Sequence, residues 1–179
     1  MNIFLTDPDP AACAQALDDV RVSKMLVETA QLLSTSLRLA GVEDAGIYKS
    51  THVAHPCSKW AAASRGNFCW LVEHGLELAR EYEFRTEHRR HHKSEGVVET
   101  CAALRANIAT GPCEFNFNSS EFVVTPDVDV FLAYRLTMIN KWRYKDPLTL
   151  KNRLKWSFRG APAWKRELWA TDLNNHEHR

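Results

Sequence analysis

Glycine is scarce in this chain, and no glycine-rich loop is present. Only seven of the 179 residues are glycine, and they are scattered rather than grouped in the spacing that cradles a nucleotide phosphate. The sequence also lacks a Gly-x-Ser-x-Gly elbow, the turn that carries the nucleophile of many serine hydrolases. These absences argue against a dinucleotide-binding fold and against an elbow-type hydrolase.

Disulfide and metal-binding patterns are missing as well. The five cysteines are an odd number at wide spacing without a Cys-x-x-Cys pair, which argues against a disulfide framework or a cysteine zinc site. The eight histidines include no His-Glu-x-x-His motif. His52 and His55 precede a predicted long helix, and His88, His91 and His92 follow it, so the two groups lie far apart. We therefore expect no metal site and no cofactor.

Long apolar runs are also absent. No stretch approaches the roughly 20 apolar residues of a membrane-spanning helix. The apolar run at residues 1–5 is too short for a signal peptide, and acidic residues follow it at once. The sequence therefore predicts a cytoplasmic protein without a membrane partner. Its 179 residues, 45% hydrophobic and 25% charged, suit a single domain that covers residues 1–179.

Charge is unevenly distributed behind a net charge of +1. Residues 135–166 contain ten Lys or Arg and one acid, whereas residues 1–83 contain seven Lys or Arg and eleven acids. Aromatic rings interleave with the C-terminal cations, a combination typical of proteins that grip single-stranded or flipped-out nucleic acid. The alternative is that the tryptophans belong to the core, with lysines at its rim. The residues predicted to bind nucleic acid are Lys141, Arg143, Lys145, Lys151, Arg153, Lys155, Arg159 and Trp156.

The segment DDVRVSKMLVETAQ, residues 18–31, predicts the start of a long central helix. Asp18 or Asp19 suits the N-cap, and Gly41 supplies a stop after about Ala40. Apolar side chains recur along one face at the three-to-four spacing of a buried stripe. A second face carries polar side chains at the same spacing, and these are Arg21, Lys24, Glu28, Gln31 and Thr35.

This polar face has two interpretations. It is either a solvated surface with a Lys24–Glu28 ion pair, or one wall of a site. In the second case Glu28 acts as a general acid or base, and Arg21 and Lys24 hold an anion. The next helix begins at a His-x-x-His-Pro motif, residues 52–56, and a helix N-terminus favours an anion. We therefore predict that the charged part of the face shares a pocket with His52 or His55.

The remaining segments predict a mainly α-helical protein. The expected architecture is a single-domain helical bundle with a short N-terminal strand or arm at residues 2–6 and an irregular basic C-terminal part. Residues 111–124 predict an irregular extended segment or a short strand, because phenylalanine and valine alternate there. Further helices are expected at residues 10–17, about 57–85 with an interruption at Gly66-Asn67 left open, 97–108, 125–142 and 162–169.

Three motifs resemble those of a family of small bacteriophage proteins. They are Asp-x-Arg-x-x-Lys-Met-x-x-Glu-Thr-Ala-Gln at residues 19–31, Thr-His-x-x-His-Pro at residues 51–56, and Glu-Tyr-x-x-Arg at residues 81–85. The resemblance covers roughly residues 1–93 and implies a phage protein. With it, the substrate-binding candidates are Arg21, Lys24, Gln31, His52, His55 and Arg85.

The spacing Asp19-x-Arg21-(x)6-Glu28 is also similar to that of the phage pyrimidine-dimer DNA glycosylase of endonuclease V type, an all-helical protein. This resemblance implies a DNA-acting enzyme, either a glycosylase/lyase or a related base-modifying enzyme. An N-terminal amine would attack the sugar carbon of a damaged nucleotide, and Glu28 would assist the glycosidic and strand-cleavage steps. Asn2 is a poor substrate for methionine removal, so the amine would be that of Met1.

Two other classes of protein remain open. One is a non-enzymatic accessory protein that binds nucleic acid through its basic C-terminal third, and the other is a nucleotide-binding protein used against host defence. A pocket lined by Arg21, Lys24, Glu28 and His55 favours the enzyme or the nucleotide binder. A fully solvated Glu28 beside a continuous basic ridge favours the accessory protein. Imine chemistry requires a neutral amine. Because α-amines ordinarily titrate near about 7.7–8.0 and lysines near about 10.4, Met1 is the better candidate than Lys24.

Overall fold

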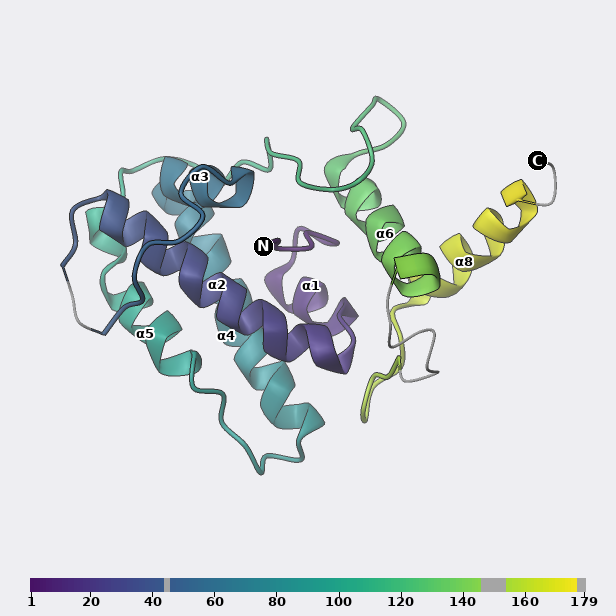
Figure 1. Cartoon of the computed structure of the whole chain (residues 1–179), viewed down its shortest axis with the longest axis horizontal. Helices are drawn as coiled ribbons and strands as arrows, with labels where there is room; N and C mark the ends of the chain where they lie inside the picture. Colours follow the sequence, from purple (N-terminus) through teal and green to yellow (C-terminus); the bar gives the residue numbers. More distant parts are fainter. Residues whose placement is uncertain (44–45, 146–153, 177–179) are drawn as a thin grey trace.

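A computed structural model describes residues 1–43, 46–145 and 154–176 (Figure 1). Within these ranges the chain forms seven α-helices and no β-sheet, and an isolated β-bridge joins Thr125 to Val128. The prediction of a mainly α protein is confirmed. No described helix is both long enough and apolar enough to cross a membrane.

Five helices build a bundle from the first 103 residues. They are α1 (Pro10–Ala16), α2 (Asp19–Leu39), α3 (Pro56–Ala63), α4 (Arg65–Arg85) and α5 (Glu95–Ala103). The two long helices α2 and α4 lie side by side, and each of the shorter helices packs against one or both of them (Figure 1). A 3₁₀ turn, η1 (Arg105–Asn107), follows α5. The helix predicted over residues 97–108 is therefore an earlier, shorter α-helix and a separate turn.

Carboxylates begin the first two helices, and at α2 the cap lies where the sequence predicts it. Asp9 accepts a hydrogen bond from the N–H of Ala11 before α1, and Asp18 accepts one from the N–H of Arg21 before α2. Helix α2 then runs unbroken to Leu39, and Gly41 follows with a φ of 86°. Local signals therefore place the central helix correctly.

The helix predicted over residues 57–85 is two helices. The break lies at Ser64, whose hydroxyl accepts a hydrogen bond from the N–H of Asn67 at 3.1 Å and so begins α4. Gly66 has another role, because a Cβ there would lie 2.3 Å from the backbone nitrogen of Cys113. The extended segment passes α4 at this point, where Asn67 Oδ1 accepts from the N–H of Glu114 at 2.8 Å.

Two segments without regular secondary structure flank the bundle. In residues 111–124 the rings of Phe117 and Phe115 lie 4.7 and 6.2 Å from the ring of Trp60. The N-terminal arm at residues 2–6 has no regular secondary structure, and Ile3 and Leu5 in it are fully buried. Neither segment pairs with another strand in the described ranges, so each takes the irregular form that the sequence allows.

The C-terminal part contains α6 (Val130–Asn140), the π-helical turn η2 (Lys141–Lys145) and α8 (Ala163–His176). Helix α6 begins later than predicted because Asp129, and not the Thr-Pro-Asp sequence at residues 125–127, caps it. Asp129 accepts a hydrogen bond from the N–H of Leu132 at 2.7 Å. Helices α6 and α8 lie beside each other at one side of the molecule (Figure 1). Helix α8 is longer than the predicted helix over residues 162–169.

His74 in α4 is a fully buried histidine. Its ring stacks on Trp70 with the centroids 5.2 Å apart, and its Nδ1 lies 3.3 Å from the carbonyl oxygen of Pro10. Its Nε2 has no hydrogen-bond partner among the described residues. Burial lowers the pKa of His74 from 6.5 to about 4. The fold therefore requires the neutral imidazole.

We expect the free energy of unfolding to fall as the pH drops from 6.5 towards 4. In that window the unfolded chain binds a proton that folded His74 does not, and the full difference is worth about 3 kcal/mol. His74→Gln keeps an N–H donor but does not titrate. The wild-type advantage over this variant, measured by urea denaturation, should therefore shrink towards low pH. A constant difference would contradict the assignment, and the exposed His88→Gln is the control.

Candidate active site at the N-terminal arm

Glu28 lies in the middle of α2, where the N-terminal arm meets the helix. Its side chain is 14% exposed, and its Oε2 lies 3.9 Å from the α-amine nitrogen of Met1. The same oxygen accepts a hydrogen bond from the backbone N–H of Asn2 at 2.8 Å. The other oxygen, Oε1, lies 3.7 Å from Nζ of Lys24, one turn earlier on the helix. A largely shielded carboxylate therefore faces a primary amine.

The other predicted residues of the α2 face point in different directions. Lys24 is 66% exposed beside Glu28, and Gln31 is half-buried one turn further along. Arg21 pairs with the N-cap, its Nη1 lying 2.5 Å from Oδ2 of Asp18. On the loop before α3, His52 is exposed, with Nδ1 2.6 Å from the hydroxyl of Thr51. The carboxylate thus has Lys24 as its neighbour on the helix.

His55 is the N-cap of α3 and lies close enough to Glu28 and the Met1 amine to respond to both charges. Its Nδ1 accepts a hydrogen bond from the N–H of Cys57 at 3.2 Å, which places the ring proton on Nε2. Partial burial lowers the pKa of His55, and the positive N-terminus and His52 lower it further, against an opposing effect of Glu28. The imidazole is therefore a neutral hydrogen-bond donor.

These groups combine the parts of a nucleophilic site. The separation of 3.9 Å between the carboxylate oxygen and the amine nitrogen is close to the distance at which the carboxylate can accept the amine proton. Such contacts tighten when substrate binds. The amine that loses this proton can attack an electrophilic carbon. The exposed ammonium group of Lys24 is suited to hold a phosphate at the same place.

A family model described as pyrimidine dimer DNA glycosylase matches residues 1–95. The chain belongs to this family. The match spans the N-terminal arm and the helices up to the first residue of α5, so it includes the amine, Glu28 and His55. It confirms the similarity to that glycosylase family and makes DNA the partner class of the chain. Comparison with curated proteins and with solved structures gives no match.

In this member of the glycosylase family, Asp19 of the Asp19-x-Arg21 motif binds the C-terminal part of the chain. Asp19 Oδ1 accepts from the N–H of Ser157 at 2.9 Å, and its Oδ2 accepts from the hydroxyl of the same serine at 2.7 Å. The neighbouring Asp18 accepts from Nε1 of Trp142 at 2.9 Å. The two acids at the start of α2 therefore attach Trp142 and Ser157 to the bundle.

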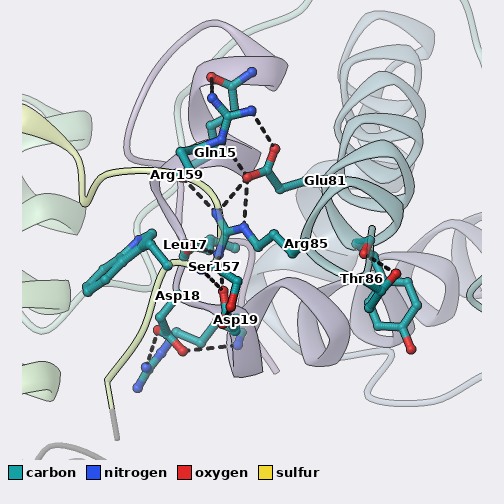
Figure 2. Close-up of polar contacts among 12 residues, drawn as sticks. Gln15, Leu17, Asp18, Asp19, Glu81, Arg85, Thr86, Ser157 and Arg159 are labelled. Atoms are coloured by element: carbon teal, nitrogen blue, oxygen red, sulfur yellow. Dashed lines mark hydrogen bonds and ion pairs between the residues drawn. The ribbon is translucent and has the colours of Figure 1, made fainter. Parts of the chain in front are cut away.

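Arg85, a predicted substrate-binding residue, lies in a buried network at the end of α4 (Figure 2). Its guanidinium group donates to Glu81 at 2.8 Å and to Asp19 at 3.1 Å. It also donates to the carbonyl oxygens of Leu17 at 2.7 Å and Gln15 at 3.1 Å. All three guanidinium nitrogens therefore bond inside the protein. Asp19 is about two and a half turns of α2 away from Glu28.

Several cations that the sequence assigns to DNA binding contact partners within the protein. The pairs are Lys141 with Glu121 (Nζ–Oε1, 3.6 Å), Arg143 with the carbonyl oxygen of Trp169 (2.5 Å) and Arg159 with Glu81 (Nε–Oε1, 2.7 Å). Trp156 donates from Nε1 to the carbonyl oxygen of Ala16 at 3.1 Å, whereas Lys155 is exposed. Many of these side chains therefore hold the C-terminal part in place. The other predicted contacts, the side chain of Lys145 and residues Lys151 and Arg153, lie outside the described residues.

One group of potential metal ligands occurs on the surface within the described ranges. Oxygen and nitrogen atoms of Glu83, His91 and Glu95 lie within 4.8 Å of one another, around the loop between α4 and α5. Nδ1 of His91 is in close contact with Glu83 and lies 3.8 Å from Oε2 of Glu95. Contacts of the His91 ring nitrogen with the two carboxylates account for this grouping.

Sequence reasoning missed Asn2 and Ser119 as members of the site. Asn2 bonds to Glu28 through its backbone, and its side chain reaches the carbonyl oxygen of Ser119 at 3.2 Å. The only local signal is an asparagine within the otherwise apolar run MNIFL. Nothing near Ser119 in the sequence indicates a partner 117 residues away.

Proposed function

We propose that this chain is a phage pyrimidine-dimer DNA glycosylase/lyase, in which the α-amine of Met1 is the nucleophile and Glu28 is its acid–base partner. The phage assignment follows the resemblance of its motifs to small bacteriophage proteins. One observation carries the enzymatic proposal. The Met1 amine lies 3.9 Å from a largely buried carboxylate that the next peptide N–H fixes at 2.8 Å.

The chemistry follows from these two groups. The amine attacks C1′ of a dimer nucleotide, a bond from nitrogen to C1′ forms, and the bond from C1′ to the base breaks. The base leaves with the bonding electrons and takes up a proton, while the amine proton passes to Glu28. Opening of the sugar ring gives an imine, and loss of the C2′ proton then expels the 3′ phosphate with the electrons of its C–O bond.

The surrounding residues are proposed to bind the DNA. Lys24 is exposed next to Glu28 and suits a phosphate, and His55 offers a neutral N–H donor. Arg21, Gln31 and His52 are proposed as further DNA contacts. Exposed cations of the C-terminal part, Lys155 among them, are proposed to contact phosphates further along the duplex.

Borohydride trapping on a duplex with one cyclobutane pyrimidine dimer tests this proposal, because reduction of the imine joins protein and DNA covalently. We expect a protein with a peptide extension before Met1 to trap no DNA. Proteolytic removal of the extension should restore trapping, and Lys24→Arg should still trap. Mass spectrometry of the linked peptide identifies the nitrogen. If Met1 is removed, the amine is that of Asn2, whose nitrogen lies 2.8 Å from Glu28.

Three other results would change the assignment. Trapping by the extended protein but not by Lys24→Arg would make Lys24 the nucleophile. A protein that binds dimer-containing DNA without any trapping would favour the non-enzymatic accessory role over the glycosylase. Binding of mononucleotides alone would favour the nucleotide-binding role.

A further inference from the structure

The N-terminal arm is held in one shape by the side chain of Asn2. Its Oδ1 accepts hydrogen bonds from the N–H groups of Ile3 at 2.8 Å and Phe4 at 3.0 Å. Asparagine often closes a short turn in this way. Phe4 has a φ of 54°, which is uncommon for a residue with a side chain, and its ring is buried. The turn and the buried ring together bend the arm.

The other end of the Asn2 amide reaches the extended segment. Its Nδ2 donates to the carbonyl oxygen of Ser119 at 3.2 Å. Ser119 is itself fixed from two sides. Its N–H donates to the hydroxyl of Tyr134 in α6 at 3.0 Å, and its hydroxyl oxygen lies 3.7 Å from the thiol of Cys57 in α3.

The groups that fix Ser119 do not titrate near neutral pH. Burial raises the pKa of the Cys57 thiol to about 11, and it raises the pKa of the Tyr134 phenol as well. Tyr134 is fully buried. Ser119 is therefore a constant anchor for Asn2 over the pH range in which an N-terminal amine gains or loses its proton.

The backbone of Asn2 completes the arrangement. Its N–H bonds to Oε2 of Glu28, so the residue that follows the amine also orients the carboxylate. The Met1 side chain is 2% exposed, and the amine nitrogen lies 3.9 Å from the same Glu28 oxygen. The position of the amine relative to Glu28 therefore depends on one residue that is attached at its backbone and at both ends of its side chain.

We propose that Asn2, anchored by Ser119 and Tyr134, is a positioning residue that holds the N-terminal amine against Glu28. The proposal rests on the proposed function, because positioning the Met1 amine affects catalysis when that amine is the nucleophile. It also assigns a part of the working site to residues 119–134, which lie beyond the residues 1–95 that the glycosylase family model matches.

Three variants test the positioning role, and intact mass first establishes which residue begins the chain. Asn2→Leu removes both side-chain contacts and keeps a large second residue, so N-terminal processing is unchanged. We expect it to lower kcat on a dimer-containing duplex by roughly 10–100-fold, because small displacements of reacting groups have effects of this size. KM should stay within about twofold and the thermal midpoint within a few degrees. Tyr134→Phe should lower kcat in the same direction by a smaller factor.

Asn2→Asp separates positioning from simple structural support. Aspartate keeps an acceptor for the N–H groups of Ile3 and Phe4, but it loses the donor to Ser119 and places a carboxylate beside the amine. We expect the acid side of its pH–rate profile to move to higher pH, since a nearby negative charge favours the ammonium form. A purely structural role would lower activity without moving the profile.

A second readout works without catalysis. Acylation of the N-terminal amine by acetic anhydride, followed by mass spectrometry as a function of pH, should show faster labelling in Asn2→Leu than in wild type, because the amine leaves Glu28. Asn2→Asp should be labelled only at higher pH. Unchanged labelling and unchanged kcat in both variants would overturn the proposal. If wild type traps no DNA but labelling changes as expected, the proposed function fails and the positioning role stands.

Discussion

Replacing Glu28 with glutamine is expected to slow cleavage of dimer-containing DNA by about 10²–10⁴-fold, the usual contribution of a general acid or base. Glutamine has the same shape and its carbonyl oxygen still accepts from the N–H of Asn2. It cannot take the proton of the Met1 amine, and it does not stabilise positive charge as the imine forms. The arm should therefore stay in place while the proton transfer is lost.

The measurement is the single-turnover rate of strand cleavage, together with the yield of borohydride-trapped complex. Affinity for the same duplex, from fluorescence anisotropy, should change only a few-fold, since the phosphate contacts remain. Glu99→Gln, an exposed glutamate in α5, is the matched control and should cleave at the wild-type rate. A Glu28→Gln protein that also cleaves at that rate would show that another group accepts the proton.

Glu28→Asp separates charge from reach. It keeps the carboxylate but shortens the side chain by one methylene, which draws the oxygen away from an amine already 3.9 Å distant. We expect an activity between those of wild type and Glu28→Gln. Activity at or below that of Glu28→Gln would mean that position matters more than charge.

The central helix and its polar face are predictable from sequence because their signals are local. An aspartate cap, three-to-four periodicity and a glycine stop lie within 24 residues, and the structure places Asp18, Leu39 and Gly41 accordingly. The same periodicity puts Lys24 one turn from Glu28. The periodicity does not show with which acid a given cation pairs. Arg21 pairs with Asp18 and not with Glu28.

The parts of the site that sequence cannot supply depend on long-range contacts. Asn2 and Ser119 are 117 residues apart, and no periodic pattern relates an irregular arm to an irregular loop. Composition likewise does not show in which direction a side chain points. A run rich in lysine and arginine predicts a basic surface, yet Arg159 turns inward to Glu81 and Arg143 covers the ring of Trp169. The same residues give the same charge count whichever way they point.

Replacing Glu81 with glutamine is expected to lower the free energy of unfolding by about 3–5 kcal/mol, the usual effect of removing one partner from a buried ion pair. Glu81 is 4% exposed and accepts from two arginines. Arg85 is itself buried, and without the Glu81 charge Asp19 is the one carboxylate left to pair with it in the described part of the chain. For a chain of this length the thermal midpoint should fall by roughly 10 °C.

Glu77→Gln is the matched control on the same helix. Its pair with Arg80 is exposed, so the variant should lose less than about 1 kcal/mol. Urea denaturation of both variants supplies the measurement. A loss for Glu81→Gln no larger than that for Glu77→Gln would mean that water reaches Arg85 once the pair is broken.

The two arginines on Glu81 should behave differently, and this difference tests what the network does. Arg85→Met should destabilise about as much as Glu81→Gln, because it leaves a buried carboxylate with one of its partners removed. Arg159 is 32% exposed and joins the segment after residue 154 to the bundle, so Arg159→Met should cost much less. The double variant Glu81→Leu, Arg85→Met removes both buried charges and should recover part of the loss, since an apolar pair of similar volume has no charge to desolvate. Recovery in the double variant, with DNA affinity of Arg85→Met unchanged, would identify Arg85 as a structural residue. A lower DNA affinity of the folded Arg85→Met protein would instead support the predicted contact with substrate.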